Sequence, residues 1–312
     1  MVSLNYVYPE IDLLQKKNTE EVFIRDVISS EIYRNNDYKL PIVLGVGEDN
    51  ENIIEDLTKM PHLLIAGDSN QGKSMLLHSI IISLLCKKGP GELQFVLIDT
   101  KMIEFNKYNS LRNHFLLRKE GEEGAVITEL GDSVAEILES LHKEMDKRFL
   151  QLKDTHTNSI SEYNDKYKAE KIKTKHDKMP YIVVVVDELA DSMMIAGDTV
   201  LKHLHPLLWL GRAIGIHVII STQRPSKDVL SNSMIINMPA HIAFKMKSTK
   251  ESEFVIGCKD ACKLSGSRDL LFSNNGELKR LRNVYIDVSD VEATIKHIAS
   301  QPCLSSPYYL SL

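Results

Sequence analysis

Short apolar runs alternate with longer amphipathic segments along most of this chain. Strands are predicted at six apolar runs: residues 41–45, 62–66, 95–98, 181–186, 216–221 and 241–246. The run at 181–186 is uninterrupted and rich in valine, which is typical of a central parallel strand that is buried on both faces. The residues Asn274-Asn275-Gly276 give a strong turn signal, so a hairpin is predicted over residues 270–286.

Helices are predicted between most of these strands. In residues 134–152 the apolar positions recur with the i, i+3, i+4, i+7 spacing of a helix with one buried face. The other predicted helices cover residues 21–33, 75–86, 200–214 and 291–300. The charged stretch 166–178 is typical of a solvated helix end and linker. The alternation predicts an α/β fold with a mostly parallel central sheet that helices cover on both faces.

Composition narrows the class of protein without identifying it. The chain has 312 residues, of which 43% are hydrophobic and 26% charged, and this suffices for one large domain. Its formal net charge is −5, so a DNA partner would require positive charge that is concentrated locally. No run of about 18 apolar residues is found, so no transmembrane helix is predicted. The N-terminal residues do not predict a signal peptide. The four irregularly spaced cysteines do not suggest a disulfide framework, so a cytoplasmic location is expected.

The segment GDSNQGKS at residues 67–74 matches the phosphate-loop pattern G-x-x-x-x-G-K-[ST]. It follows a predicted strand and precedes a predicted helix, so its backbone N–H groups can surround a phosphate. Lys73 is expected to reach the β- and γ-phosphates of ATP, and the Ser74 hydroxyl to bind Mg²⁺. The predicted nucleotide-binding residues are Gly67, Asp68, Ser69, Asn70, Gln71, Gly72, Lys73, Ser74 and Met75.

Polar residues follow two further strands of the predicted sheet. Asp187 and Glu188 come directly after the valine run, where Asp187 can organise Mg²⁺ and Glu188 can activate the attacking water. Gln223 follows the next strand and is expected to sense the γ-phosphate, although a simple turn before Pro225 would explain the same residues. Asp99 and Lys101 follow another strand, with a less defined role.

Several of these segments together resemble the motor of FtsK/SpoIIIE DNA translocases. The resemblance covers roughly residues 40–300 and is carried by residues 60–67, 97–102, 182–191, 215–217 and 222–226. It implies a RecA-like P-loop NTPase fold, ATP hydrolysis, a homo-oligomeric ring that is usually hexameric, and double-stranded DNA moved through its pore during cell division and chromosome partition. It also implies that Arg212 reaches the nucleotide of a neighbouring subunit, although a surface arginine on a helix explains that residue equally well.

The chain departs from the family pattern in its domains. Three parts are expected: a remnant of the family's N-terminal α domain at residues 1–39, the ATPase motor at 40–300, and a C-terminal tail at 301–312. Residues 8–14 resemble the beginning of the α domain and residues 22–25 its end, so most of that domain is expected to be missing. Within the phosphate loop, Asn70 stands where the family has glycine, and asparagine tolerates positive φ better than other side chains.

The expected DNA-facing positions also differ. The family has basic residues at or near Asn158, Ile236 and His241, and a Ser-Arg pair where Ser252-Glu253 stands. The remaining candidates for phosphate contacts are Lys245, Lys247, Lys250, Lys259 and Lys263. Because phosphate contacts carry most DNA affinity that does not depend on sequence, a weakened grip on DNA is expected.

The leading hypothesis is therefore an ATP-dependent DNA translocase motor, or a reduced paralogue of one. Two alternatives stay open at this point. One is an ATPase that moves protein or conjugative substrates, and the other is a nucleotide-binding regulatory subunit without translocase activity.

Overall fold

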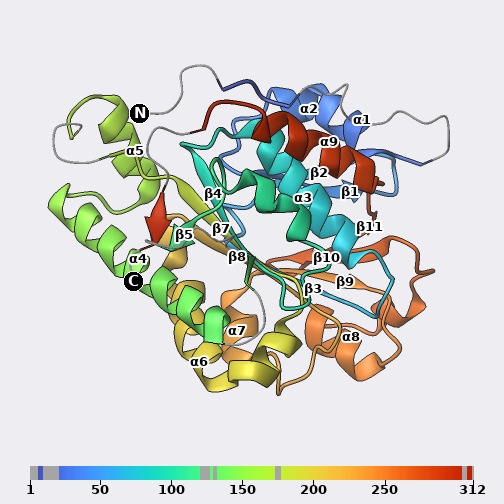
Figure 1. Ribbon diagram of the computed structural model, residues 1–312. Helices are drawn as coiled ribbons and strands as arrows, with labels where there is room; N and C mark the ends of the chain where they lie inside the picture. The colour runs from blue at the N-terminus through green and yellow to red at the C-terminus, as the bar shows by residue number, and fades with distance from the viewer. Residues whose placement is uncertain are drawn as a thin grey trace.

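The computed structural model describes residues 6–9, 21–119, 127–128, 132–172, 177–303 and 308–310. Ten strands form its central sheet: β1 (Pro41–Val46), β2 (Asn52–Asp56), β3 (His62–Ala66), β4 (Leu93–Ile98), β6 (Ile127–Thr128), β7 (Tyr181–Val186), β8 (Ile216–Thr222), β9 (Ala240–Phe244), β10 (Asp269–Asn274) and β11 (Glu277–Arg282). Their order across the sheet is β2-β1-β11-β10-β9-β3-β8-β7-β4-β6 (Figure 1).

The sheet has a parallel half and an antiparallel half. The six strands from β9 to β6 are parallel to their neighbours, as the βα alternation predicts. The four strands from β2 to β10 pair antiparallel, and β10 also pairs antiparallel with β9. The hairpin around Asn275 is confirmed, whereas β2 was not predicted because Ile53 and Ile54 are its only apolar residues.

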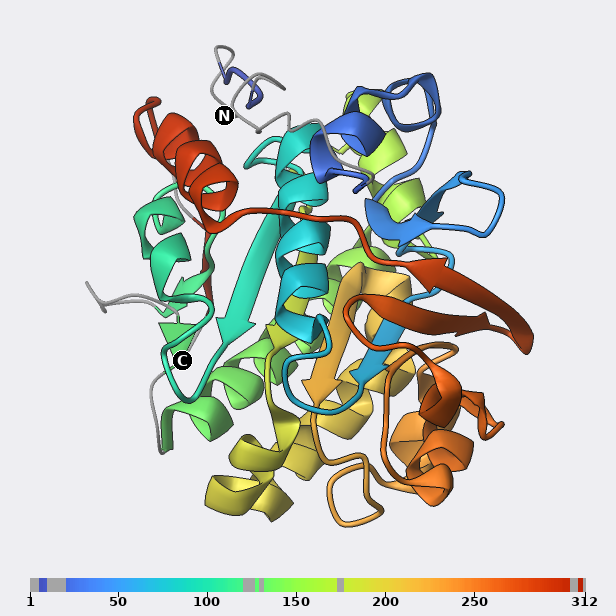
Figure 2. The ribbon, with the colours of Figure 1, turned by 90° about the vertical axis from the view of Figure 1, so that its right-hand side faces the viewer.

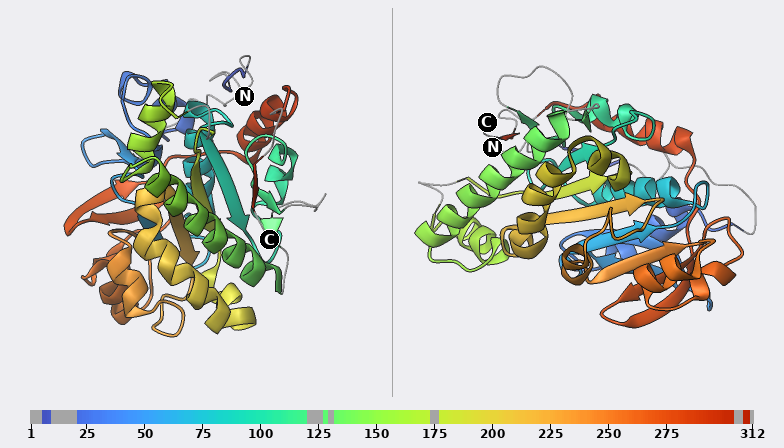
Figure 3. Two further views of the ribbon diagram at one scale, coloured as in Figure 1. Left: turned by 90° about the vertical axis from the view of Figure 1, so that its left-hand side faces the viewer. Right: turned by 90° about the horizontal axis from the view of Figure 1, so that it is seen from below.

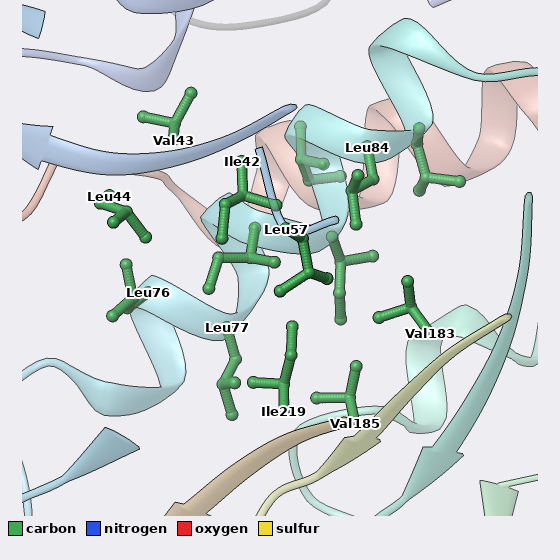
Figure 4. Packing of buried hydrophobic residues seen from close by; sticks show 14 of the residues in the cluster. Ile42, Val43, Leu44, Leu57, Leu76, Leu77, Leu84, Val183, Val185 and Ile219 are labelled. Carbon is green, nitrogen blue, oxygen red and sulfur yellow. The ribbon is translucent and has the colours of Figure 1, made fainter. Parts of the chain in front are cut away.

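Strand side chains alternate between two buried clusters. On β7, Val183 and Val185 belong to one cluster, whereas Ile182, Val184 and Val186 belong to the other. Figure 4 shows part of the first cluster, where Val183 and Val185 lie near Ile219 of β8 and Leu77 of the helix above them. A parallel strand that is buried on both faces needs this uninterrupted apolar sequence.

Helices cover both faces of the sheet (Figures 2 and 3). The first cluster is completed by α1 (Ile24–Ser29), α2 (Glu31–Arg34), α3 (Lys73–Lys87) and α9 (Val288–Ala299). The second is completed by α4 (Asp132–Asp154), α5 (Ile160–Lys168), α6 (Leu189–Leu210), α7 (Asn232–Asn237) and α8 (Thr249–Ile256). The predicted α/β architecture with two covered faces is therefore confirmed.

Two predicted helices have different bounds. The helix expected at 21–33 is two short helices, because Ser30 adopts an extended ψ of 149° and caps α2 by accepting from the backbone of Tyr33. The helix expected at 200–214 begins at Leu189, capped by Glu188, and gives way at Gly211 to the 3₁₀ helix η3 (Gly211–Ile214). Its first turns hold Asp191, Ser192 and Gly197, which conceal the helical pattern in the sequence.

The segments expected to flank the motor pack against it where they are described. Ile24, Val27 and Tyr33 lie in the same buried cluster as β1, so α1 and α2 are continuous with the core. In the tail, Leu310 is buried, and β12 (Tyr309–Leu310) pairs with β5 (Arg118–Lys119). Residues 10–14 and 311–312, on which parts of the domain prediction rest, lie outside the described residues.

A buried arginine ties the second helical layer to the start of the parallel strands. The Arg148 side chain is 2% exposed; its Nη1 donates to the carbonyl oxygens of Pro180 and Ile214, both at 2.9 Å. Its Nε donates to Glu144 Oε1 at 2.8 Å. One side chain thus joins α4 to the residue before β7 and to the end of η3.

Replacing Arg148 with alanine is expected to destabilise the fold by about 3–5 kcal/mol, because it leaves the Glu144 carboxylate and two carbonyls without their donor. Chemical denaturation measures this change. Lys147→Ala on the same helix is the control, and its expected effect is below about 1 kcal/mol since Lys147 pairs with Glu144 at the surface. Equal effects of the two substitutions would contradict this role for Arg148.

Candidate active site

The phosphate loop connects the end of β3 to the start of α3. Gly67, Asn70 and Gly72 have φ of 156°, 60° and 117°, so the loop contains three positions with positive φ, and asparagine occupies one of them as expected. A Cβ on Gly67 would lie 2.6 Å from Cβ of Phe244, the last residue of β9. The loop is therefore compact and lies directly against the edge where the parallel and antiparallel halves meet.

Two residues that flank the antiparallel hairpin of β10 and β11 also contact the phosphate loop. The backbone N–H of Arg268 donates to the Gln71 carbonyl at 3.2 Å, and Asn283 Nδ2 donates to the Gly72 carbonyl at 3.3 Å. Neither residue was predicted to contact the site. Only the pairing of β10 and β11 with the rest of the sheet brings them there.

Lys73 lies inside the loop and is only 6% exposed. Its Nζ donates to the carbonyl oxygens of Gly67 and Asp68, both at 2.7 Å. Burial lowers the pKa of Lys73, and the carboxylates of Glu188, Asp187 and Asp68 oppose that effect. A buried ammonium in a loop of backbone N–H groups, at the start of a 15-residue helix, fits a phosphate group.

Asp187 and Glu188 follow β7 at the same edge of the sheet. The pKa of Asp187 is raised to about 7, first by burial and then by Asp99, Glu104 and Glu188, while Lys73 opposes the rise. Mg²⁺ usually binds one or two carboxylates and keeps several waters, so Asp187 together with the Ser74 hydroxyl fits its donor set. Ser74 lies opposite, at the start of α3, and lines the same cavity.

The Glu188 carboxylate is held by three donors. Its Oε1 accepts from Thr222 Oγ1 at 2.7 Å and from the backbone of Ala190 at 3.2 Å, while Oε2 accepts from the backbone of Gln223 at 2.8 Å. Gln223 Oε1 in turn accepts from Ser69 Oγ at 2.5 Å. Gln223 therefore contacts both the phosphate loop and the acid that follows β7.

This contact follows from the strand order. Because β8 lies between β3 and β7, the residues after β8 are placed between the phosphate loop and the two acids. Asp187 nevertheless lines the same cavity as Lys73 and Ser74.

The site surrounds a cavity of about 510 Å³. Its lining includes nine predicted residues, namely Ser69, Asn70, Gly72, Lys73, Ser74, Met75, Asp187, Glu188 and Gln223. It also includes Lys101, Ile103, Glu104 and Ser221. Gly67, Asp68, Gln71 and Arg212 do not line it.

Glu104 is the acid that sequence reasoning missed. His78 Nε2 lies 3.3 Å from its Oε2, and hydrogen bonds from His78 and Ser74 lower its pKa. The backbone N–H groups of Lys101, Glu104 and Phe105 donate to the Asp99 carboxylate, so Asp99 shapes the turn that presents Glu104. The signal available in the sequence was an acid, Glu104, five residues after Asp99, the aspartate that follows β4.

Arg212 lies far from the cavity of its own chain. It is exposed on η3, which precedes β8, whereas Gln223 comes directly after the last residue of β8. Since a seven-residue strand spans roughly 20 Å, Arg212 and the cavity lie at opposite edges of the sheet.

The four expected DNA-facing positions lie on several elements. Asn158 is exposed between α4 and α5, and Ile236 is exposed on α7. His241 on β9 is partly buried, and burial lowers its pKa, so it is a poor source of positive charge. Glu253 on α8 forms an ion pair with Lys259 at 3.6 Å.

Among the lysines considered as replacements, Lys263 is paired with Asp260 at 2.7 Å, as Lys259 is with Glu253. Two of the five candidate cations therefore already face carboxylates.

None of the helices within the described ranges is both long enough and apolar enough to cross a bilayer.

Comparison with known proteins gives one family. The FtsK/SpoIIIE family matches residues 23–227. The chain is 40% identical over 285 residues to the DNA translocase FtsK of Chlorobaculum tepidum, covering 91% of this chain and 35% of that protein. It is 36% identical over 284 residues to the DNA translocase SpoIIIE of Bacillus subtilis, covering 90% and 35%. The chain thus spans about a third of the length of these relatives.

Solved structures with the same fold include two P-loop ATPases. The conjugation coupling protein TcpA of pCW3, in a monomer form with ATPγS, is similar with a TM-score of 0.71 and 25% identity, over 90% of this chain and 75% of that one. The cytoplasmic domain of the type VII secretion ATPase EccC of Thermomonospora curvata has a TM-score of 0.75 at 21% identity, over 94% and 36%. The predicted P-loop NTPase fold is therefore confirmed.

The raised pKa of Asp187 predicts a stability change that depends on pH. Its folded-state pKa of about 7 exceeds the unfolded value near 4, so its ionisation costs stability progressively from pH 4 to pH 7 and fully above pH 7. Asp187→Asn is expected to raise the melting temperature by several degrees at pH 8 without nucleotide or Mg²⁺. At pH 4–5 this gain should nearly vanish.

Thermal unfolding followed by circular dichroism at several pH values measures the effect. Asp198→Asn is the matched control, because Asp198 is exposed on α6. A gain in melting temperature that is absent at pH 8, or equally large at pH 5, would contradict the raised pKa of Asp187.

Proposed function

The chain belongs to the FtsK/SpoIIIE family, and from this we propose that it is an ATP-driven motor subunit that moves double-stranded DNA. The contact that supports a motor, beyond nucleotide binding alone, is Gln223 between Ser69 of the phosphate loop and Glu188. It links the place where a γ-phosphate would lie to the end of a central strand.

We propose that ATP and Mg²⁺ are the nucleotide and metal. Lys73 would bind the β- and γ-phosphates in place of its present carbonyl partners, and the loop backbone would donate to the same oxygens. Ser74 would hold Mg²⁺ directly and Asp187 through water, and the ion would neutralise charge on the phosphate oxygens.

In this mechanism Glu188 orients the attacking water and accepts its proton. The donors Thr222 and Gln223 fix the carboxylate, so its position depends on β8 as well as on β7. A shift of Gln223 on γ-phosphate loss would therefore release a restraint on Glu188 and move the loop after β8.

Arg212 is proposed to act on the nucleotide of a neighbouring subunit. It cannot reach its own cavity, and Trp209, three residues earlier, is 73% exposed. A large exposed aromatic beside an exposed cation is a composition enriched at protein interfaces. A closed ring, with a hexamer as the expected size, would place this surface against the cavity of the next copy.

The grip on DNA is proposed to be weak in the isolated chain. The non-basic residues at Asn158, Ile236 and Glu253, together with the two paired lysines, reduce the number of phosphate contacts per subunit. Each contact that is absent lowers the slope of log affinity against log salt by about 0.9.

Hydrolysis of ATP with and without duplex DNA tests the function. We expect Mg²⁺-dependent ATPase activity that DNA raises several-fold at low salt, with the stimulation lost by about 200 mM salt. Lys73→Ala should abolish nucleotide binding, whereas Glu188→Gln should bind ATP and hydrolyse it at least 100-fold more slowly.

The other outcomes separate the alternatives. Activity that duplex DNA leaves unchanged at every salt concentration favours a motor for protein or conjugative substrates. Binding of ATP without hydrolysis in the unaltered chain favours a regulatory subunit.

Mixing two inactive variants tests Arg212. Subunits that carry Arg212→Ala and subunits that carry Glu188→Gln should be nearly inactive alone and regain part of the activity when mixed, since some interfaces then contain an intact pair. Because Trp209 is the single tryptophan, its emission should also shift to the blue on assembly. No recovery in mixtures whose emission shows assembly would refute action between subunits.

A further inference from the structure

A second, smaller pocket lies at the opposite edge of the sheet from the nucleotide cavity. It has a volume of about 90 Å³ and is lined by four lysines, Lys39, Lys88, Lys168 and Lys178. Glu92 and Tyr181, which come at the starts of β4 and β7, also line it. Since β4 and β7 carry Asp99 and Asp187 at their far ends, roughly 15–20 Å separates this pocket from the phosphate loop.

The pocket carries an excess of positive charge. Its four lysines face two carboxylates, Glu92 and Asp165. Lys178 Nζ lies 3.3 Å from Glu92 Oε1, so one lysine is already neutralised. Within the described part of the chain, Lys39, Lys88 and Lys168 have no hydrogen-bonded acceptor or ion-pair partner.

Lys88 is the least solvated of these cations. It is the C-terminal cap of α3 and is partly buried, and burial lowers its pKa while Glu92 and Asp56 oppose the change. By contrast, the Nζ of the neighbouring Lys87 donates to the carbonyl oxygens of Tyr33 and Arg34. Lys88 has no such partner, so an anion in the pocket would supply the missing acceptor.

The walls of the pocket are held in place without a ligand. Asn164 donates to the Met179 carbonyl at 2.8 Å and accepts from the Met179 backbone at 3.1 Å, which fixes α5 against the entry to β7. The backbone of Tyr181 donates to the Glu92 carbonyl at 2.9 Å, which fixes the entries to β7 and β4 together. The lysines therefore extend from a rigid base.

We propose that this pocket binds a phosphate group. A volume of about 90 Å³ equals that of roughly three water molecules, which suits a phosphate or pyrophosphate group and is smaller than the roughly 300–1,000 Å³ of pockets that enclose a whole small-molecule ligand. Lysine ammonium groups bind phosphate as point charges and need no planar geometry. On this proposal, Lys168 and Lys178 of the charged stretch 166–178 have a binding role in addition to their contact with solvent.

The phosphate can come from the DNA backbone or from a free phosphate compound. Ser161, on α5, lines the pocket and lies three residues after Asn158, which is one of the expected DNA-facing positions. This favours the DNA backbone, and that part of the proposal rests on the proposed function.

Binding of inorganic pyrophosphate to the 312-residue chain tests the site by isothermal titration calorimetry. All variants carry Lys73→Ala, so that the phosphate loop does not contribute. Adding Lys88→Gln and Lys168→Gln is expected to weaken binding at least tenfold. The matched control adds Lys171→Gln and Lys202→Gln, two exposed lysines outside the pocket, and removes the same charge.

No saturable binding in the Lys73→Ala chain, or an equal loss in the control, would overturn the proposal. Melting curves of the variants establish that they fold, and glutamine keeps most of the lysine stem in place.

A second titration with a 30-base-pair duplex separates the two sources. If DNA supplies the phosphate, the pocket substitutions reduce the salt slope by about two and pyrophosphate competes with DNA. If the source is a free compound, DNA affinity falls no more than in the control while pyrophosphate binding is still lost. If duplex DNA leaves the ATPase activity unchanged while the pocket substitutions abolish pyrophosphate binding, the proposed function is refuted and the phosphate site is still supported.

Discussion

The site depends on three hydrogen bonds that the Glu188 carboxylate accepts. They draw on α6, through Ala190, and on the end of β8, through Thr222 and Gln223. Because β8 separates β3 from β7, these bonds are the route by which the phosphate loop and the acids contact each other. Because β3, β8 and β7 are parallel, their carboxyl ends lie at the same edge of the sheet, which brings these residues together.

The same concentration of charge limits stability. Asp187, Glu104 and Lys73 lie in one partly buried cluster, and the raised pKa of Asp187 shows that its charged form is not fully compensated within the chain. Uncompensated charge of this kind is common at functional sites, where a ligand supplies the missing counter-charge. The apolar strands β7 and β8 provide the burial that offsets it.

Local sequence patterns predicted the parallel half of the fold and most of the cavity lining, because each depends on a short segment. The phosphate loop lies within eight residues, and Asp187 and Glu188 end an unmistakable strand. The order of the strands could not be predicted, since nothing in the sequence of β8 states that it pairs with both β3 and β7. Arg268 and Asn283 were missed for the same reason: their contribution arises from long-range pairing. Glu104 is presented by a local turn that Asp99 shapes, so its omission was a local signal left unused. The pocket around Lys88 is assembled from four separate segments and has no linear signature.

The contact between Gly67 and Phe244 has a consequence for how such a sequence can evolve. A Cβ at 67 would collide with the Cβ and backbone of Phe244, and a Cβ at 72 would lie 3.0 Å from the ring of Phe244. The strand that borders the antiparallel half therefore limits which residues the phosphate loop can hold. A smaller side chain at 244 would not admit a larger residue at 67, because the clash is with Cβ and backbone atoms and because the φ of 156° at Gly67 disfavours any side chain. Position 67 is therefore expected to stay glycine among related sequences, whatever side chain stands at 244. Strand β9, although it carries none of the proposed catalytic side chains, thereby restricts which loop sequences can be inherited.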